Sequence, residues 1–355
     1  MSGGTMKFRP LLLLPILASL LTTLPGEAAP KKPKPEVLLK VATLAPEGST
    51  WMNLMHELDK RVREETGNEV GLKFYAGGVQ GDERLVLRKM RSGQLHGGGF
   101  TGNGLGVVAP SLRVLESPFL FESEDEIDAV YAELGSEFDA AIEASGHVLL
   151  GWAEVGFVHL FTKKPVRSVN DLRSAKMWLW EGDPLALAFF EEAGVAPVSL
   201  AITDVYTSLQ TGLVDGVYSS PYAGVVLQWH TQVAAMSEIP ITHAIGAVIV
   251  TRKQWDKISE PSQAAIRGVA ADVFPRLKAS SREDNRGALK AIREAGIEVV
   301  PFPAAEMQQF REIGKRAALR GVGDLYPAEL LERVRSVIAA DRTTAGNEAA
   351  ATDEP

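Results

Sequence analysis

Two glycine-rich motifs around residues 96–102 suit catalysis or cofactor binding. His96-Gly97-Gly98-Gly99 matches the oxyanion-hole motif of some esterases, but the sequence lacks the Gly-x-Ser-x-Gly nucleophile motif that this chemistry needs. The glycines at 97, 99 and 102 also fit the dinucleotide fingerprint, which requires a preceding strand and a helix directly after it. We expect a helix over 85–90 before these glycines and a loop at 103–106 after them. The segment is therefore interpreted as a glycine-rich strand end, where backbone or ligand approaches closely.

Histidines and carboxylates give no catalytic or metal-binding pattern. The six histidines, at positions 56, 96, 147, 159, 230 and 243, show no metal-ligand spacing such as His-Glu-x-x-His. No pair of catalytic carboxylates stands out. The histidines are interpreted as surface or packing residues, with His159 and His243 as the ones that would line a site. We predict that the protein is not an enzyme and has no metal and no cofactor.

Aromatic residues are more informative. Trp178 and Trp180 alternate along a strand expected over 177–180, which places both on one face of a sheet. Tyr218 and Tyr222 lie around the end of another strand, expected over 214–219. Two interpretations remain open. The aromatic residues pack in a core, or they form the wall of an apolar ligand cleft, because tryptophan supplies a large apolar area with few rotamers to freeze.

The elements that would position these residues alternate between strands and helices, which predicts an α/β protein with largely parallel sheets. The other expected strands cover 37–43, 69–75, 147–154, 158–162 and 246–251. Expected helices cover 50–66, 124–144, 184–193, 203–212 and 330–340, with capping residues Ser49 or Thr50, Ser123 and Asp183. A long helix over 261–295 contains Pro275, and a proline inside a helix kinks or breaks it.

The first 29 residues have the features of a secretory signal peptide. Lys7 and Arg9 precede an apolar run over 11–24, and small residues follow at Ala28 and Ala29. The run is shorter than the roughly 20 apolar residues that span a bilayer, and a retained anchor is the alternative. These features predict an exported protein. Because the sequence has no cysteine, we predict that it has no lipid anchor and no disulfides.

Composition limits the remaining possibilities. The chain has 355 residues, of which 45% are hydrophobic and 23% are charged, as in ordinary globular proteins of about two domains. These values exclude a mostly disordered chain and a polytopic membrane protein. The net charge of -8 argues against nucleic-acid binding, which normally shows a basic patch. Residues 343–355 are small and polar, and we expect them to be disordered.

Several segments, in order along the chain, resemble one family of binding proteins. They are 40–49 (Lys-Val-Ala-Thr-Leu-Ala-Pro-Glu-Gly-Ser), 77–83 (Gly-Gly-Val-Gln-Gly-Asp-Glu), 118–121 (Pro-Phe-Leu-Phe), 164–166 with 171–172, and 205–216, the most specific match. Over about 37–340 the chain is similar to the DctP-type substrate-binding proteins of tripartite ATP-independent periplasmic (TRAP) transporters. The resemblance implies an α/β periplasmic-binding-protein fold of two lobes. A hinge, crossing strands and a long kinked helix bridge the lobes, which close on a ligand and deliver it to TRAP membrane subunits.

The departures from this family bear on the ligand. Most members hold a ligand carboxylate with an arginine in a Lys-Ile/Met-Arg-Val segment, and Trp178 stands at that place here. Val158 stands in place of a second family arginine. The asparagine that usually follows Val-Asp-Gly in this family is also absent here, and Ser219 and Ser220 lie near that place. Arginine suits this task because its rigid fork binds a carboxylate with two hydrogen bonds. We therefore expect a variant that lacks the carboxylate-clamping arginine.

The predicted ligand is uncharged or amphipathic. Its apolar body would lie against the aromatic residues, and nearby polar side chains would fix its polar end. Asp183 is one of these side chains, with a role as helix cap alone as the alternative. The predicted ligand-binding residues are Leu44, Glu83, Thr101, Asn103, Phe157, Val158, Trp178, Trp180, Glu181, Ile202, Tyr218, Ser219 and Tyr222. A cationic head over the indoles and a carboxylate held by non-standard contacts are the alternatives.

The predicted organisation is a signal peptide (1–29), a first lobe (36–155 plus 246–284), a second lobe (156–245 plus 285–342) and a disordered tail (343–355). The resemblance implies a periplasmic location and two partners, the TRAP membrane subunits and, in some members, a separate periplasmic protein of helical repeats. A sensory ligand-binding module on the same fold is the alternative function.

Overall fold

The computed structural model describes Met1 and residues 34–352, with side chains as far as Thr344. The chain divides into Met1–Lys34 and Pro35–Pro355, and the following description concerns the second unit alone. The predicted signal peptide lies outside the described residues except for Met1. Within the described part, no helix has the length and apolar character needed to cross a membrane.

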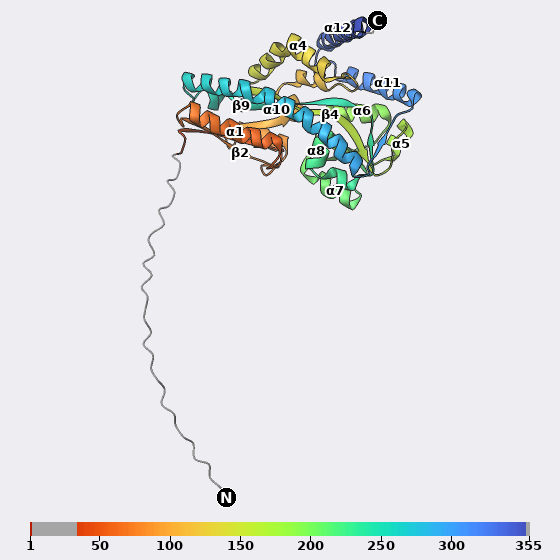
Figure 1. The fold of residues 1–355 in the computed structure, drawn as a ribbon, viewed down its shortest axis with the longest axis horizontal. Coiled ribbons are helices and arrows are strands. Elements are labelled where there is room, and N and C mark those ends of the chain that lie inside the picture. The colour runs from red at the N-terminus through yellow and green to blue at the C-terminus, as the bar shows by residue number, and fades with distance from the viewer. Residues whose placement is uncertain (2–33, 353–355) are drawn as a thin grey trace. The chain divides into compact units, whose positions relative to one another are not determined.

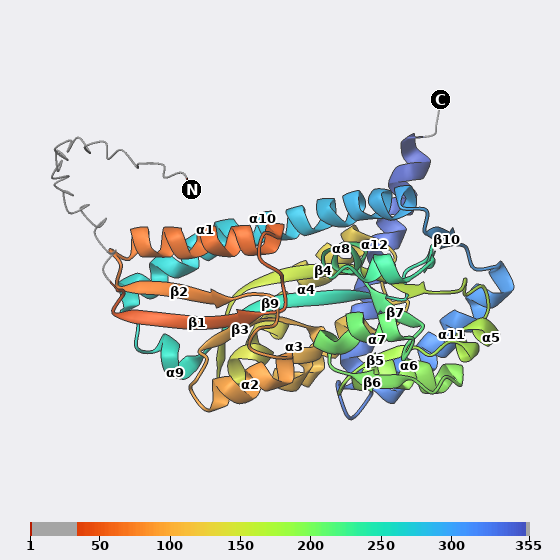
Figure 2. The same cartoon turned by 90° about the horizontal axis from the view of Figure 1, so that it is seen from below.

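The described strands form a mixed eight-stranded sheet in the order β10–β8–β4–β9–β3–β1–β2, with β7 beside β4 (Figures 1 and 2). They are β1 (Val37–Thr43), β2 (Val70–Tyr75), β3 (Gly97–Thr101), β4 (His147–Thr162), β7 (Gly216–Ser219), β8 (Ala235–Ser237), β9 (Thr242–Thr251) and β10 (Glu298–Val300). The strands β5 (Trp178–Trp180) and β6 (Val198–Leu200) form a separate parallel pair. We call the edge with β1, β2 and β3 the β2 end, and the edge with β7, β8 and β10 the β10 end.

The prediction of largely parallel sheets is wrong. The strand β9 runs antiparallel to both β3 and β4, and β4 is also antiparallel to β7 and β8. The alternation of elements along the sequence shows where strands occur, but it does not determine which strands become neighbours. The strands β8 and β9 both run antiparallel to β4 and lie on opposite sides of it, although only four residues separate them along the chain.

The strand β4 was predicted as two strands, over 147–154 and 158–162, but it is continuous. Its pairing with β9 shifts register between Glu154 and Gly156. Gly156 has a φ of 110°, and a Cβ there would lie 2.5 Å from Asn285 Nδ2. A β-bulge at a glycine accounts for both observations, because it bends the strand and interrupts the alternation of side chains.

The helices cover both faces of the sheet. They are α1 (Thr50–Glu65), α2 (Glu83–Arg91), α3 (Gly102–Val108), α4 (Glu124–Ala144), α5 (Val169–Ser174), α6 (Pro184–Ala193), α7 (Val205–Thr211), α8 (Pro221–Val226), α9 (Arg252–Trp255), α10 (Glu260–Glu294), α11 (Ala304–Arg320) and α12 (Ala328–Thr352), with 3-10 turns η1 (Pro110–Glu116), η2 (Ile202–Asp204) and η3 (Trp229–Gln232). The predicted caps Ser49, Ser123 and Asp183 each accept a hydrogen bond from a first-turn amide.

Three helices differ from the prediction. The helix α3 occupies 103–106, where a loop was expected, and Thr101 caps it. The helix α10 continues through Pro275 without a break. The helix α12 continues to Thr352, through residues predicted to be disordered, because the alanines of this segment have high helix propensity.

The alternation of side chains in β9 connects two hydrophobic cores. Ile245 and Ile249 pack with α2, α3, α4 and α12, whereas Val248 and Val250 pack with α1 and α10 on the other face. Two further cores lie at the β10 end, one with α5, α6 and α11 and one with α7 and β7. The helix α10 contributes to cores at both ends and runs alongside α1 from the β2 end toward the β10 end (Figure 2).

Candidate ligand-binding site

A cavity of about 230 Å³ lies between the elements of the two ends of the sheet. We call the elements toward the β2 end the β2 side and those toward the β10 end the β10 side. On the β2 side, the cavity is lined by β3, α3, η1 and the loop between β1 and α1. On the β10 side it is lined by β5, α6, β7, α8 and η3. Most lining side chains are apolar, and a few polar groups converge among them, as in small-molecule binding sites.

Most of the predicted site residues surround this cavity. The lining includes Leu44, Glu83, Thr101, Asn103, Val158, Trp178, Trp180, Ile202, Tyr218, Ser219 and Tyr222. Two predictions are not met. Phe157 lies beside a second cavity, because the bulge at Gly156 changes which side chains face each side of β4, and Glu181 is exposed in the turn between β5 and α6. Contact of the other residues with a ligand stays a prediction.

The aromatic wall consists of Trp178, Trp180, Tyr218 and Trp229. Trp178 is 1% exposed and stacks on Tyr218 with ring centroids 5.0 Å apart, while Trp229 meets it edge-on at 5.4 Å. The Nε1 of Trp178 donates to Leu200 O at 3.0 Å, and the Nε1 of Trp180 donates to Asp82 Oδ2 at 2.8 Å. These residues therefore pack in a core and also line the cavity, and their role as the wall of a ligand site stays a prediction.

A buried arginine beside the cavity was missed from the sequence. Arg113 in η1 is 4% exposed, and it donates from Nη1 to Glu116 and from Nη2 to Asp183 Oδ1, the latter at 2.6 Å. Burial lowers the pKa of Arg113, but the carboxylates of Asp183 and Glu116 outweigh this and raise it above its ordinary value. The residue stays charged. The signal that could have identified it is the charge of Arg113 within the otherwise apolar run 112–115, with Glu116 directly after that run.

Alternate glycines in α3 make room for the charged side chains around it. A Cβ on Gly102 would lie 2.0 Å from the Glu116 carboxylate, and one on Gly106 would lie 2.6 Å from Cδ of Arg113. A Cβ on Gly104 would likewise lie 2.6 Å from Glu83 Oε2. The glycine-rich segment therefore serves close packing of side chains, and its first glycines lie within β3 instead of following a strand as a dinucleotide site requires.

Glu83 and Asn103 provide polar groups at the same helix. Glu83 accepts hydrogen bonds from the backbone N–H groups of Thr101 and Gly104, each at 2.7 Å, so it helps to cap α3. Burial raises the pKa of Glu83 to about 8, against the effect of these hydrogen bonds. Asn103 is 6% exposed, and its Nδ2 has no hydrogen-bond partner among the described residues. An acceptor from a ligand or an ordered water molecule would satisfy this donor.

Hydrogen bonds join the two sides around the cavity. Besides its bond with Trp180, Asp82 at the start of α2 accepts from Ile202 N at 3.5 Å. Arg84 donates to Gly182 O at 3.1 Å, and Thr50 N donates to Tyr222 Oη at 3.3 Å. Together with the Arg113–Asp183 ion pair, these contacts hold the β2 and β10 sides against each other.

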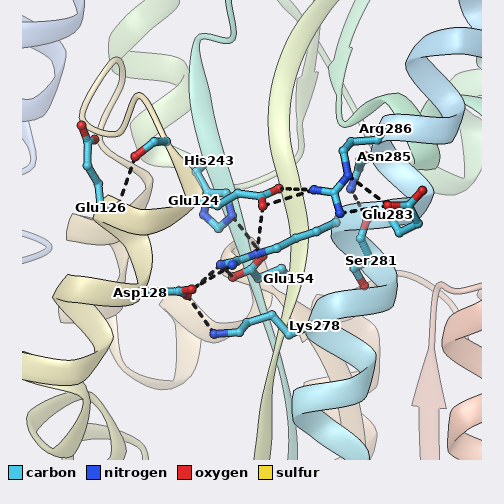
Figure 3. A network of polar contacts seen from close by, with 12 residues as sticks. Glu124, Glu126, Asp128, Glu154, His243, Lys278, Ser281, Glu283, Asn285 and Arg286 are labelled. Atoms are coloured by element: carbon cyan, nitrogen blue, oxygen red, sulfur yellow. Dashed lines mark hydrogen bonds and ion pairs between the residues drawn. The ribbon is translucent and has the colours of Figure 1, made fainter. Parts of the chain in front are cut away.

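A second charged cluster surrounds the bulge in β4 (Figure 3). Arg282 of α10 binds Glu154 of β4 and Asp128 of α4 with Nη2–carboxylate distances of 2.7 Å. Lys278 also binds Asp128, at 2.8 Å. The hydrogen bonds from Arg282 are the main reason that the pKa of Asp128 falls to about 2. The cluster ties α4, β4 and α10 together.

The two histidines considered as site residues lie beside this cluster, along a second cavity of about 260 Å³. His243 is 2% exposed, and neither ring nitrogen has a hydrogen-bond partner among the described residues. Burial lowers the pKa of His243 to about 3 and that of His159 to about 4. Both rings are therefore neutral at pH 7, and neither lines the cavity that holds the aromatic wall.

Comparisons with known proteins agree on one family. Residues 41–320 match the family model of DctP, described as bacterial extracellular solute-binding protein, family 7. A solute-binding protein of Chromohalobacter salexigens is 29% identical over 68% of this chain and 72% of its own length. The 2,3-diketo-L-gulonate-binding periplasmic protein YiaO of Escherichia coli is 22% identical over 67% of this chain and 73% of its own length.

Solved structures confirm the two-lobed α/β fold. A TRAP periplasmic solute-binding protein from Desulfovibrio salexigens, with bound orotic acid, superposes with a TM-score of 0.78, at 20% identity over 86% of this chain and 99% of that one. A sugar acid binding protein from Advenella mimigardefordensis, in complex with galactonate, gives a TM-score of 0.79 at 19% identity over 87% and 99% of the two chains. Similarity at this identity shows the fold alone, whereas the family match covers most of the sequence. The chain belongs to the DctP family of bacterial extracellular solute-binding proteins.

Proposed function

We propose that the protein is a periplasmic, non-enzymatic receptor that binds a small solute in the 230 Å³ cavity and delivers it to the membrane subunits of a TRAP transporter. The observation that carries the proposal is the cavity itself, which is enclosed by residues from both sides and crossed by direct contacts between them. A ligand that contacts both sides favours the closed arrangement over an open one, and its release requires these contacts to break.

The proposed lobes keep the boundaries predicted from the sequence. The boundary at 155/156 falls on the bulge in β4, and the one at 284/285 falls in α10 at Asn285. Asn285 Nδ2 donates to Val155 O at 3.0 Å, while its Oδ1 accepts from Tyr222 N at 3.0 Å. The side chain of Asn285 in α10 therefore connects the bulge in β4 with α8. This makes the bulge a suitable place for the hinge.

We propose an amphipathic ligand, with its apolar body against the aromatic wall and a hydrogen-bond acceptor directed at Asn103 Nδ2. Organic acids form the second candidate class. The Desulfovibrio and Advenella proteins are described with bound orotic acid and galactonate, and Arg113 is a cation beside the cavity. A partner made of helical repeats stays a prediction, with no contact surface assigned to it.

Binding titrations test this function. Protein purified without refolding is titrated calorimetrically with uncharged, amphipathic, cationic and carboxylate solutes, and solute extracted from the protein is identified by mass spectrometry. The variant Asn103→Asp replaces the unpartnered donor with an acceptor and should weaken binding at least about tenfold. The matched control Asn170→Asp lies on the exposed start of α5 and should leave binding unchanged. A failure of every solute class to bind would overturn the proposal.

A further inference from the structure

Arg113 lies where the two sides of the cavity meet, and carboxylates of the chain itself occupy its guanidinium. Its side chain is 5% exposed. Nη1 donates to Glu116, and Nη2 donates to Asp183 Oδ1 at 2.6 Å. Nε has no hydrogen-bond partner among the described residues. The two carboxylates thus take up two of the three guanidinium nitrogens.

The two carboxylates approach Arg113 from different sides. Glu116 belongs to the same segment, η1, and its Oε1 also accepts from Ile245 N of β9 at 3.0 Å, so it stays with the β2 side. Asp183 is the N-cap of α6, whose apolar residues pack in a core of the β10 end. Asp183 therefore reaches Arg113 across the cavity, as the carboxylate of a bound solute would.

The charges of the cavity lining do not favour a further anion. Its acidic and basic residues are Glu83, Arg113, Glu116, Glu154, Asp183 and Asp284, so Arg113 is the single lysine or arginine among the described lining residues. Glu154 is paired with Arg282, outside this lining. A solute carboxylate at Nε of Arg113 would be a third anion on one cation, and elsewhere in the cavity it would be buried near carboxylates without a counter-ion. A favourable ion pair therefore requires that it displace Asp183 from Arg113.

We propose that Asp183 is a specificity-determining residue: its carboxylate fills, from within the chain, the side of Arg113 that a solute carboxylate would occupy. The cavity therefore selects solutes without negative charge, and removal of the Asp183 carboxylate creates an anion site at Arg113. This inference rests on the proposed receptor function and defines the substrate class of the same cavity.

The test uses substitutions that keep the helix cap. Asp183→Ser removes the carboxylate and leaves space beside Arg113, while serine remains a good N-cap. Asp183→Asn removes the charge with little change of shape and carries the same test if the serine variant does not fold. The control Asp204→Asn changes an exposed aspartate at the start of α7 that makes no side-chain cap. The probes are formate, acetate and the neutral acetamide, each against chloride at constant ionic strength.

We expect 100 mM acetate or formate to raise the melting temperature of Asp183→Ser by at least about 2 °C, the shift for a ligand with Kd of roughly 10 mM. Asp183→Asn should show a smaller rise with formate. Wild type and Asp204→Asn should show none, and acetamide should have no effect on any variant. An equal acetate response of wild type and Asp183→Ser, or no response of either folded Asp183 variant, would overturn the inference.

Failure of the inference differs from failure of the receptor function. Micromolar binding of a small organic acid to wild type would show that Asp183 does not exclude anions, while the receptor function would stand. If no solute of any class bound wild type, the receptor function would fail, yet the acetate response of Asp183→Ser would still report the state of Arg113.

Discussion

Among the described residues, buried Arg113 and partly buried Arg282 each form hydrogen bonds with two carboxylates, and the two clusters differ in what they join. Arg282 of α10 is 14% exposed in its side chain, and its partners Asp128 and Glu154 belong to α4 and β4, which fall with it in the first of the two proposed lobes. Arg113 is 5% exposed, and one of its partners, Asp183, comes from the opposite side of the cavity.

This difference assigns the clusters different roles. With the proposed lobe boundaries, a movement that separates the two sides of the cavity must break the Arg113–Asp183 bond, whereas Arg282, Asp128 and Glu154 stay together in the first lobe. We therefore expect the Arg282 cluster to stabilise that lobe in every arrangement and the Arg113 cluster to stabilise the closed arrangement.

The largest expected effect on the free energy of unfolding follows from the loss of the Arg282 cluster. Arg282→Met leaves Glu154, which is 4% exposed, without its counter-ion, and should lower the free energy of unfolding by about 3 kcal/mol. The matched control is Arg286→Met, one turn further along α10, whose side chain is 56% exposed and whose ion pairs should contribute less than about 0.5 kcal/mol. Urea unfolding compares the two, and equal losses would contradict the assigned role.

A smaller effect should follow from crowding the other cluster. Gly102→Ala places a Cβ about 2 Å from the Glu116 carboxylate and should cost roughly 1–3 kcal/mol, because the Glu116 side chain must move away from Arg113. Gly135→Ala, in the interior of α4 with open space around its Cβ position, should instead raise the free energy of unfolding by up to about 1 kcal/mol. Similar unfolding curves for both variants would show that the packing around α3 is not tight.

The carboxyl groups of the two regions should respond differently to pH. The pKa of Glu83 beside the cavity is raised to about 8, so the folded state keeps a proton that the unfolded state loses above its ordinary pKa of 4.5. Stability relative to Glu83→Gln should therefore fall between pH 5 and 8, by at most about 1.4 kcal/mol per pH unit.

The control for this prediction is Asp128→Asn. Because the pKa of Asp128 is lowered to about 2, its contribution is fully present above pH 3.8 and is lost only as the pH falls toward 2. The stability difference between wild type and Asp128→Asn should stay constant from pH 5 to 8. Urea unfolding at pH 5, 6.5 and 8 gives both differences, and a flat profile for Glu83→Gln would rule out the raised pKa.

The smallest effect at neutral pH is expected for His243→Leu. Neither ring nitrogen has a hydrogen-bond partner among the described residues, so an apolar side chain should change the free energy of unfolding at pH 7 by less than about 1 kcal/mol. Because burial lowers the pKa of His243 to about 3, wild type should lose stability relative to the variant as the pH falls below 6.5. Thermal melts at pH 7 and 5 check this, with the exposed His56→Gln as control; parallel pH profiles would contradict it.

The sequence predicted a strand or helix correctly where residues close together in the chain determine its bounds. The strand β1 matches its predicted bounds, and Asp183 followed by Pro184 marks the start of α6. Strand direction and the continuity of β4 were missed, because they depend on neighbours distant in sequence and on a bulge at Gly156. The helix α3 was missed for a similar reason, since its glycines are explained only by the side chains packed against them.

The site was predicted in part. The aromatic wall was identified because tryptophans alternating in a strand share a face, as Trp178 and Trp180 do. Arg113 was missed because its ion pair with Asp183 joins residues 70 positions apart. Asp183 was recognised as a helix cap, a role that short-range sequence shows, while its second partner becomes visible only when the two sides of the cavity are assembled.

The shared oxygen of Asp183 has a consequence for local dynamics. Oδ1 accepts from Arg113 Nη2 and from the amides of Leu185 and Ala186, both at 3.1 Å. In the proposed opening of the cavity, Asp183 loses the cation that fixes its position, and we expect the first turn of α6 to fray more readily. The amide protons of Leu185 and Ala186 therefore act as reporters of closure, since their exchange with solvent should slow when a solute is bound and accelerate when it leaves.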